Sequence, residues 1–386
     1  MNTFTKSHHY PDAGTLLAQY DLSESLRIGI NDGLESLLSA LEQEPGMSDT
    51  GSRRALDDIH HDLQRLQTIA DYRRRYPEIS EVAIERPLFV LGLPRCGTSI
   101  LQGLMSADPE VRTPLMWEVA TPDPPPEAAS FDDDPRIAAF DAFVEREFSG
   151  PFADLLAAHP IGARMPQECG SFMTTSFLSS NPVMSYRVPS YYRWFLQADK
   201  SFRYEVHKMW LQHLSWHNRR KHWVLKIQEH MYSLPELLSV YPDAILVQPH
   251  RDPVEVVPSI SRLIELLRGF AFDSIDRVAL GREMLRLWND GQVRMMAYRA
   301  AHPELSIHDL RYADLVADPV AAVSGIYRHA GWTFTVEAEA GVKRWLAANP
   351  SGKHGRHRYQ LEDFGLTPAM VRDAYADYIE AYRDYL

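Results

Sequence analysis

Residues 88–105 place the strongest limit on how this chain can fold. Leu88–Leu91 is a short apolar run that ends in the turn Gly92–Gly97, and a helical pattern follows from Ser99 to Met105. A strand, a glycine-containing loop and a helix in this order typically open a parallel α/β sheet. Glycines let the backbone N–H groups of such a loop turn inward, where they bind an anion together with the helix N-terminus. The segment therefore predicts a phosphate-binding loop.

The loop departs at position 98 from the P-loop pattern of nucleoside triphosphatases. Gly92 and Gly97 are separated by four residues, as in the P-loop, but Thr98 stands where that pattern has lysine. Without the lysine, an enzyme that cleaves a β–γ phosphate bond loses its main positive charge there. Arg95 supplies a cation three positions earlier. A P-loop kinase or nucleoside triphosphatase therefore stays an alternative interpretation of this loop, but it is not the favoured one.

Further strand and helix patterns continue the α/β alternation. Two buried strands are expected at Trp223–Leu225 and Ala244–Val247, and a last one at Leu305–Ile307. Helices are expected at Leu234–Tyr241, Ile260–Leu267 and Arg282–Ala300, with mostly helical structure from Ile137 to Asn218. This order predicts a three-layer, P-loop-like α/β domain over residues 86–386, with a central parallel sheet flanked by helices.

Residues 1–80 are predicted to form an N-terminal helical extension. Apolar residues recur at helical spacing in Leu34–Leu41 and again in Leu56–Ile69. The stretch Gln43–Arg53, which contains proline and glycine, is expected to be the loop between these helices. The extension carries no recognisable chemistry, so it is interpreted as a packing element or a lid.

The composition limits which partners the protein is expected to bind and in which cellular compartment it is expected to reside. The 52 acidic and 40 basic residues give a net charge of −12, which argues against nucleic acid as a partner because binding its backbone rests on excess lysine and arginine. The two cysteines, Cys96 and Cys169, cannot form a disulfide framework. No apolar run approaches the roughly 18 residues of a membrane span, and Met1–Tyr10 lacks a signal-peptide pattern. We expect a cytoplasmic protein without an integral membrane segment, and leave open whether it forms a homo-oligomer.

A second anion-binding position is expected well after the loop. Arg251 follows closely on the predicted strand Ala244–Val247, and Ser259 lies eight residues further on. A strand end followed by a helix start places both residues at the carboxyl edge of the sheet, where open α/β folds bind ligands. Arginine offers planar, bidentate donors to a phosphate, and serine adds a hydroxyl. The alternative for Arg251 is a surface salt bridge with Asp252 or Glu255.

These residues together resemble the sulfotransferases that use 3′-phosphoadenosine-5′-phosphosulfate (PAPS). The string Pro94, Arg95, Cys96, Gly97, Thr98 and Ser99 is similar to the loop that binds the 5′-phosphosulfate in that family. It departs from the usual form at Cys96, where serine is common, and is followed by Ile100, where many cytosolic members have tryptophan. Arg251 and Ser259 resemble the family's 3′-phosphate motif.

Two later segments resemble the family as well. Tyr312, in a Tyr-x-Asp-Leu segment, would contact adenine. The basic loop with Lys353, His354, Gly355 and Arg356 would close over the 3′-phosphate. The segments Trp117-Glu118 and Gln167-Glu168-Cys169 are similar to the large bacterial branch. The resemblance spans roughly residues 87–365.

The resemblance implies a metal-independent transfer of a sulfuryl group from PAPS to an acceptor hydroxyl, leaving 3′-phosphoadenosine-5′-phosphate (PAP) as product. His230 is the expected general base, because the family has a strand lysine followed by such a histidine. Lys226 and Arg95 would supply positive charge to the transition state. Glu118 competes for the role of base, since a glutamate after the phosphate loop performs it in some branches. Glu229 is a third candidate.

The acceptor is left as a small molecule, a lipid or a glycan. Aromatic residues gather between positions 172 and 216 and fit either an apolar acceptor pocket or ordinary helical core. A second alternative to the enzyme is a non-catalytic nucleotide-binding module that kept the fold. The joint presence of Arg95, Lys226 and His230 argues against that loss of chemistry.

Overall fold

A parallel sheet forms the centre of the molecule. The computed structural model describes residues 9–44, 46–148, 153–350 and 360–386. Within these ranges five strands, all parallel, follow the order β2-β3-β1-β4-β5. The strands are β1 Leu88–Val90, β2 Val111–Arg112, β3 His222–Lys226, β4 Ile245–His250 and β5 Ile307–Arg311. The predicted parallel α/β sheet is confirmed, and the two-residue edge strand β2 is the one that the sequence patterns missed.

The last strand differs from its prediction. It was expected at Leu305–Ile307, but β5 begins at Ile307 and pairs there with Leu246 of β4. Its polar residue Asp309 hides the strand from a search for apolar runs. The Asp309 carboxylate accepts two hydrogen bonds from Arg299, each of 2.8 Å, and lies 2.8 Å from the ring of His250 on β4. Ion pairing thus replaces apolar burial at this end of the sheet.

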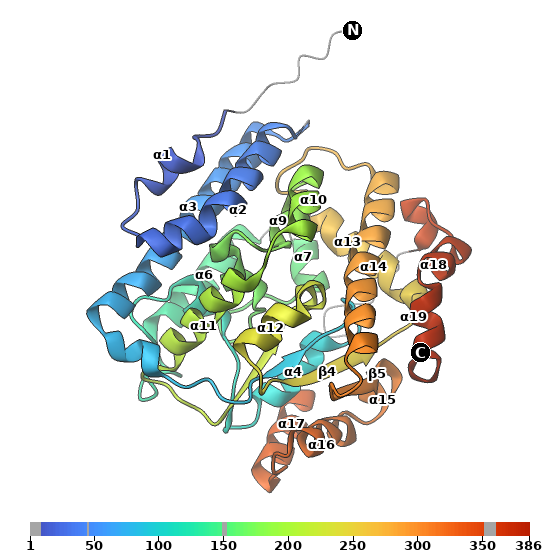
Figure 1. The fold of residues 1–386 in the computed structure, drawn as a ribbon. Helices are drawn as coiled ribbons and strands as arrows, with labels where there is room; N and C mark the ends of the chain where they lie inside the picture. Colours follow the sequence, from blue (N-terminus) through green and yellow to red (C-terminus); the bar gives the residue numbers. More distant parts are fainter. Residues whose placement is uncertain (1–8, 45, 149–152, 351–359) are drawn as a thin grey trace.

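The two faces of the sheet pack against different helices. Leu88 and Val90 face one apolar layer, and Phe89 faces the other, as the alternation of a strand requires. The first layer contains α4 Thr98–Ser106, α16 Pro319–Ala330 and α17 Val336–Ala348, and the second contains α11 Ser201–Ser215, α12 Leu234–Val240, α13 Pro253–Arg268 and α14 Arg277–Ala301. Figure 1 shows α16 and α17 on one side of the sheet and α11 to α14 on the other. The three-layer prediction is confirmed.

The predicted helices α12, α13 and α14 are present with small shifts at their ends. α13 begins earlier than expected, because the Asp252 carboxylate caps it through the Val254 N–H at 2.9 Å and Pro253 occupies its first turn. The long segment between β2 and β3 is largely helical. It contains α5 Met116–Ala120, α6 Pro135–Glu147, α7 Ala153–Ala158, α8 Gly170–Met173, α9 Asn181–Ser185 and α10 Pro189–Gln197.

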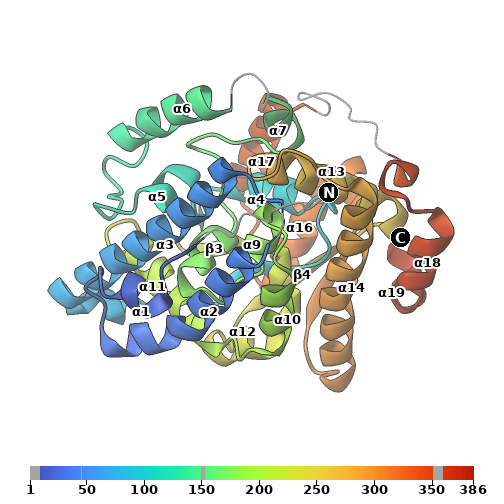
Figure 2. The same ribbon diagram turned by 90° about the horizontal axis from the view of Figure 1, so that it is seen from above.

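The remaining elements lie at the ends of the chain and in short turns. The chain closes with α15 Tyr312–Ala317, α18 Pro368–Ala374 and α19 Ala376–Ala381, and the last two pack beside α14 (Figure 2). Five 3₁₀ helices are described: η1 Pro77–Glu81, η3 Thr174–Ser176, η4 Gln228–Tyr232, η5 Leu361–Phe364 and η6 Arg383–Tyr385. No helix in the described ranges has the length and apolar content needed to cross a membrane.

The N-terminal helices are α1 Ala13–Leu17, α2 Glu24–Glu42 and α3 Asp49–Arg75. The expected loop Gln43–Arg53 is too long, because Ser48 caps α3 by accepting a hydrogen bond from the Gly51 N–H at 2.9 Å. α2 packs on α10 and α3 on α11, and all four contribute to the apolar layer that covers Phe89. Helices α1, α2 and α3 therefore share a core with the sheet, and the separation of residues 1–80 as a domain stays a prediction.

Candidate active site

The loop after β1 has the backbone form of an anion site. Gly92, Arg95 and Gly97 have positive φ values of 95°, 63° and 82°. A side chain at Gly97 would place its Cβ 2.8 Å from Leu315 and 3.1 Å from the ring of Tyr312, so only glycine fits there. The positive φ of Arg95 is strained for a residue with a side chain, and such backbone outliers cluster at functional sites. α4 begins directly after Gly97, which turns its first N–H groups toward the loop.

The residues predicted for the two anion positions meet at this loop. The Arg95 Nε donates to Ser259 Oγ at 3.0 Å, and Arg251 Nη1 donates to the Arg95 carbonyl at 2.9 Å. The Arg251 guanidinium also lies 4.3 Å from the centre of the Tyr312 ring and pairs with Glu255 at 2.7 Å. The surface ion pair expected as the alternative is therefore present with Glu255, while anion binding by Arg251 stays a prediction.

An ion pair at the end of β3 lies against the other side of the loop. Lys226, whose side chain is 2% exposed, donates to Ser99 Oγ at 3.0 Å and pairs with Glu168, which keeps 24% exposure. Burial raises the pKa of Glu168, but the charges of Lys226 and His159 outweigh it, so the pKa falls below its ordinary value. An ionised carboxylate thus stands beside the predicted phosphosulfate loop.

Sequence reasoning missed Glu168 as a site residue. It appeared only as part of a family-like segment, and nothing in its spacing links it to Lys226. The pair forms because the Cys169 N–H donates to the Lys226 carbonyl at 3.0 Å, which holds the turn against β3. His159 shares this environment: burial lowers its pKa, Glu168 raises it, and Lys226 lowers it further.

Two loop residues face inward. Cys96 is fully buried, its Sγ lies 3.6 Å from the Pro94 carbonyl, and burial raises the pKa of the thiol to about 12. Thr98 is also buried and accepts a hydrogen bond from Gln228 Nε2 at 3.3 Å. A cysteine in place of the usual serine therefore packs into the core, and a hydroxyl is not needed at that position for packing.

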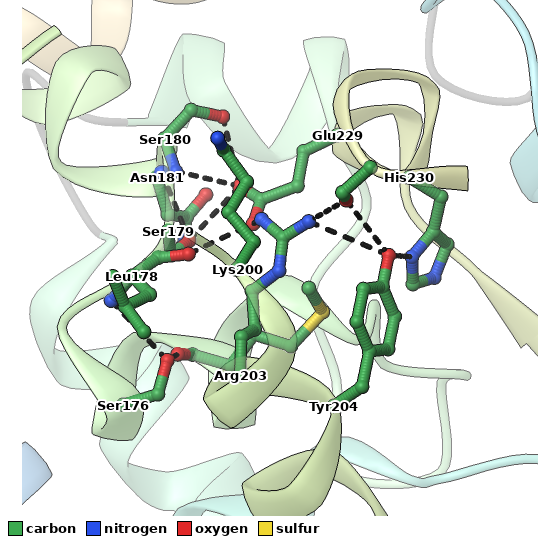
Figure 3. Close-up of polar contacts among 12 residues, drawn as sticks. Ser176, Leu178, Ser179, Ser180, Asn181, Lys200, Arg203, Tyr204, Glu229 and His230 are labelled. Carbon is green, nitrogen blue, oxygen red and sulfur yellow. Dashed lines mark hydrogen bonds and ion pairs between the residues drawn. The ribbon is translucent and has the colours of Figure 1, made fainter. Parts of the chain in front are cut away.

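Figure 3 shows His230 beside Tyr204, and no described contact joins the His230 side chain to the loop, so its role as base stays a prediction. His230 has no exposed surface, its Nδ1 lies 2.8 Å from the Tyr204 hydroxyl, and its ring meets the edge of Phe89 at 5.0 Å. Burial lowers the pKa of His230 well below its ordinary value. Glu229 is buried beside it and pairs with Arg203 at 2.6 Å. Glu229 also accepts hydrogen bonds from the Ser179 and Ser180 hydroxyls, so its carboxylate is enclosed by polar partners.

Glu118 is a structural carboxylate in this arrangement. It is 0% exposed, accepts hydrogen bonds of 2.7 and 2.6 Å from Arg112, and accepts a third from the Leu115 N–H at 2.7 Å. None of its described contacts reaches the loop. The predicted residues Lys353, His354, Gly355 and Arg356 lie outside the described residues.

Comparison with known proteins decides the family. Residues 87–336 match the family model described as "Sulfotransferase family". The chain belongs to the sulfotransferase family. A curated relative, the omega-hydroxy-beta-dihydromenaquinone-9 sulfotransferase Stf3 of Mycobacterium tuberculosis, is 23% identical over 327 residues, which cover 78% of this sulfotransferase and 76% of the relative. The same match is found with Stf3 of Mycobacterium bovis. These matches confirm the prediction that the protein is an enzyme that transfers a sulfuryl group.

Two solved structures extend the likeness to the N-terminal helices. Sulfotransferase STF9 from Mycobacterium avium is 26% identical, with a TM-score of 0.85, and the match covers 99% of this chain and 98% of that one. Sulfotransferase STF1 from Mycobacterium tuberculosis H37Rv is 28% identical, with a TM-score of 0.81 and coverages of 95% and 97%. The likeness therefore includes the first 80 residues, which the sequence motifs did not reach.

Proposed function

We propose that this sulfotransferase takes its sulfuryl group from PAPS. The contact that carries the proposal joins Arg95 of the loop to Ser259, with Arg251 bonded to the Arg95 carbonyl. A nucleotide that carries anions at both its 5′ and 3′ positions needs two such positions side by side. In this proposal residues Pro94 to Ser99 hold the 5′-phosphosulfate, Arg251 and Ser259 hold the 3′-phosphate, and Tyr312 lies against adenine.

Glu168 is the proposed general base, in place of His230 and Glu118. Glu168 is ionised, partly exposed and joined to the loop through Lys226, whereas the other two side chains are closed in by their partners. Attack of the acceptor oxygen on sulfur forms the new S–O bond while the bond from sulfur to the bridging phosphate oxygen breaks. The hydroxyl proton passes to Glu168, and PAP leaves with the electron pair. Lys226 and Arg95 stabilise the charge that develops on the leaving oxygen.

Through Lys226, binding of the donor raises the basicity of Glu168. A carboxylate paired with lysine has a lowered pKa and is a weak base. A donor whose bridging oxygen draws the Lys226 ammonium away from Glu168 raises the pKa of that carboxyl toward the working pH, where proton transfer is most efficient. The pair therefore couples donor binding to base strength.

The acceptor is proposed to be a lipid with a terminal hydroxyl. A cavity of about 280 Å³ lies beside Gln167, the neighbour of Glu168, and is lined by Leu37, Leu41 and Ile59 from α2 and α3. Polar side chains, among them Asp58 and Asp62, line another part of it. The curated relatives are named for an ω-hydroxylated menaquinone, which has a long apolar body and one end hydroxyl. The apolar part of this cavity and the ω-hydroxyl in the relatives' name support a lipid acceptor over a glycan.

Thermal stabilisation by nucleotides tests the donor without knowledge of the acceptor. A ligand that binds only the folded chain stabilises it by RT ln(1 + [L]/Kd), so at equal concentrations the tighter ligand gives the larger rise in melting temperature. PAP should therefore stabilise the chain more than AMP or ATP with Mg²⁺. Arg251→Ala should weaken PAP binding by about 1.5–3 kcal/mol, or roughly 10- to 150-fold, because charged hydrogen bonds are lost. Arg277→Ala, at an exposed arginine paired with Glu265, serves as the control.

Two results would overturn the donor proposal. One is a preference for ATP with Mg²⁺, and the other is a PAP affinity that Arg251→Ala leaves unchanged. The acceptor is tested separately, by incubating the enzyme with PAPS and long-chain ω-hydroxy lipids or oligosaccharides and detecting the sulfated product by mass spectrometry. Sulfation of sugars alone would reject a lipid acceptor and leave the donor site intact.

A further inference from the structure

Three buried side chains that the transfer reaction does not use meet in the apolar layer. They are Cys169, His207 and His230, and their ligand atoms all lie within 4.8 Å of one another. Each is 0% exposed. They come from three different segments: the turn before α8, the middle of α11, and η4. In the part of the chain that the structure describes, this is the one group of three or more cysteine, histidine or acidic side chains arranged in this way.

Both histidine rings leave one nitrogen without a partner. The Nδ1 of His207 lies 2.8 Å from the Tyr241 hydroxyl, and the Nδ1 of His230 lies 2.8 Å from the Tyr204 hydroxyl. The two Nε2 atoms are buried and have no hydrogen-bond partner. A polar atom that stays unpaired in a dry core destabilises the fold, so such atoms are rare in native proteins. Two histidines that each keep an unpartnered ring nitrogen, and whose ligand atoms lie within 4.8 Å of one another and of Cys169, point to a missing shared partner.

The donor set has the chemistry of a soft metal ion. Thiolate and imidazole ligands select zinc or monovalent copper, whereas calcium and magnesium take oxygen ligands. Bonds of about 2.3 Å to sulfur and 2.0–2.1 Å to nitrogen place the ligand atoms roughly 3.5–3.8 Å apart around a metal. The limit of 4.8 Å observed among these three atoms leaves about 1 Å to be closed by small side-chain rotations.

The surroundings of the two rings match those of metal-binding histidines. Such histidines usually hold their second nitrogen against an oxygen, which fixes the ring and leaves the other lone pair for the metal. Tyr241 and Tyr204 provide that oxygen. Phe89 lies 5.0 Å from the His230 ring and Phe172 lies 5.0 Å from the His207 ring, so apolar walls close the group off.

We propose that Cys169, His207 and His230 bind one soft metal ion, Zn(II) or Cu(I), as a structural site. The ion forms bonds to both orphan Nε2 atoms and to the Cys169 sulfur, which gives up its proton on binding. It ties the turn before α8 and η4 to α11. Metal binding explains why the His230 side chain is buried in the core. It is separate from sulfuryl transfer, for which no metal is invoked.

Metal content is the first test. The full chain, without a histidine tag, is produced in medium supplemented with zinc or with copper and analysed by elemental mass spectrometry. We expect about one ion per chain. Cys169→Ser, which nearly preserves volume, and His207→Gln should lose it. His213→Gln is the matched control, because His213 is also buried with an unpartnered ring nitrogen but bonds to Pro122 through the other.

Cobalt binding keeps the test decisive where a variant folds poorly. The wild-type chain is unfolded with a chelator, refolded without metal and titrated with Co(II). We expect a thiolate-to-cobalt charge-transfer band, and its loss on addition of Zn(II) or of buffered Cu(I) then identifies the preferred ion. Removal of the metal should lower the melting temperature by about 5 °C. A metal-free chain with no cobalt band overturns the proposal, as does metal that Cys169→Ser retains in full.

Discussion

Two glutamates with cationic partners show how differently this chain uses the same side chain. Glu118 is fully buried, and both its oxygens are occupied by Arg112, with Leu115 adding a third hydrogen bond. Glu168 keeps 24% exposure, and Lys226 is the partner described for it. Lys226 in turn contacts Ser99 of the loop. The first pair is enclosed by its own hydrogen bonds, and the second lies next to Ser99, at the start of the helix that follows the glycine-containing loop.

The two carboxylates differ in whether they can still accept a proton. A buried carboxylate with saturated hydrogen bonds is held in one protonation state, and its removal leaves a buried charge without a partner. A carboxylate with one lysine and access to solvent can exchange its proton once the lysine moves. Proximity to a motif in the sequence does not separate the two, because Glu118 is nearer to the loop along the chain than Glu168.

The largest expected effect comes from Glu168→Gln. The change keeps size and removes the proton acceptor, so kcat should fall by about 10²–10⁴-fold, the range typical for loss of a general base. PAP affinity should stay close to that of the wild type. Steady-state kinetics with PAPS and a reactive acceptor, together with PAP titration calorimetry, measure the two effects.

The matched variant His230→Gln sharpens this expectation. If Glu168 is the base, His230→Gln lowers stability and metal content but leaves kcat per folded molecule within a few-fold of the wild type. A kcat loss in His230→Gln as large as that in Glu168→Gln, with the fold intact, would return the role of base to His230.

Glu118→Gln should instead act on stability. The Arg112 guanidinium, 2% exposed, would keep its charge without a carboxylate, and breaking a buried pair from one side costs about 3–5 kcal/mol. Chemical denaturation measures this loss. Turnover per folded molecule should change little. A variant as stable as the wild type but without activity would reverse the comparison and make Glu118 the catalytic carboxylate.

Much of the fold could be predicted from residues whose role is local. The loop from Gly92 to Ser99 follows from glycine at positive φ, and β3 and β4 follow from apolar runs. β5 was misplaced because Asp309 depends on Arg299 and His250, and such an ion network leaves no apolar pattern. Strand and helix positions placed Arg251 and Ser259 at the carboxyl edge of the sheet, but the contact between Arg95 and Ser259 was not predicted.

The proposed base was harder to find from the sequence, because the choice among candidates rests on burial and contacts. A histidine after a strand lysine suggested the base, yet the chain turns inward at η4 and places His230 against Phe89. Glu168 reaches Lys226 through a backbone hydrogen bond between Cys169 and the strand. No spacing rule connects residues that lie 58 positions apart. Such pairs become visible only once the turn and the strand are placed in space.

The pH dependence of turnover gives the smallest and most specific effect. The folded-state pKa of Glu168 is lowered, so the carboxylate is ionised above its ordinary value of 4.5 and takes up a proton only as the pH falls through the lowered value. In kcat/KM, which reports the free enzyme, no acidic limb should therefore appear between about pH 5 and 7, where an unperturbed histidine titrates. Circular dichroism at each pH separates loss of fold from loss of base. A limb near pH 6 that survives in the intact fold would point to His159, the titratable neighbour of Glu168 and Lys226, and would break the assignment of the base to Glu168.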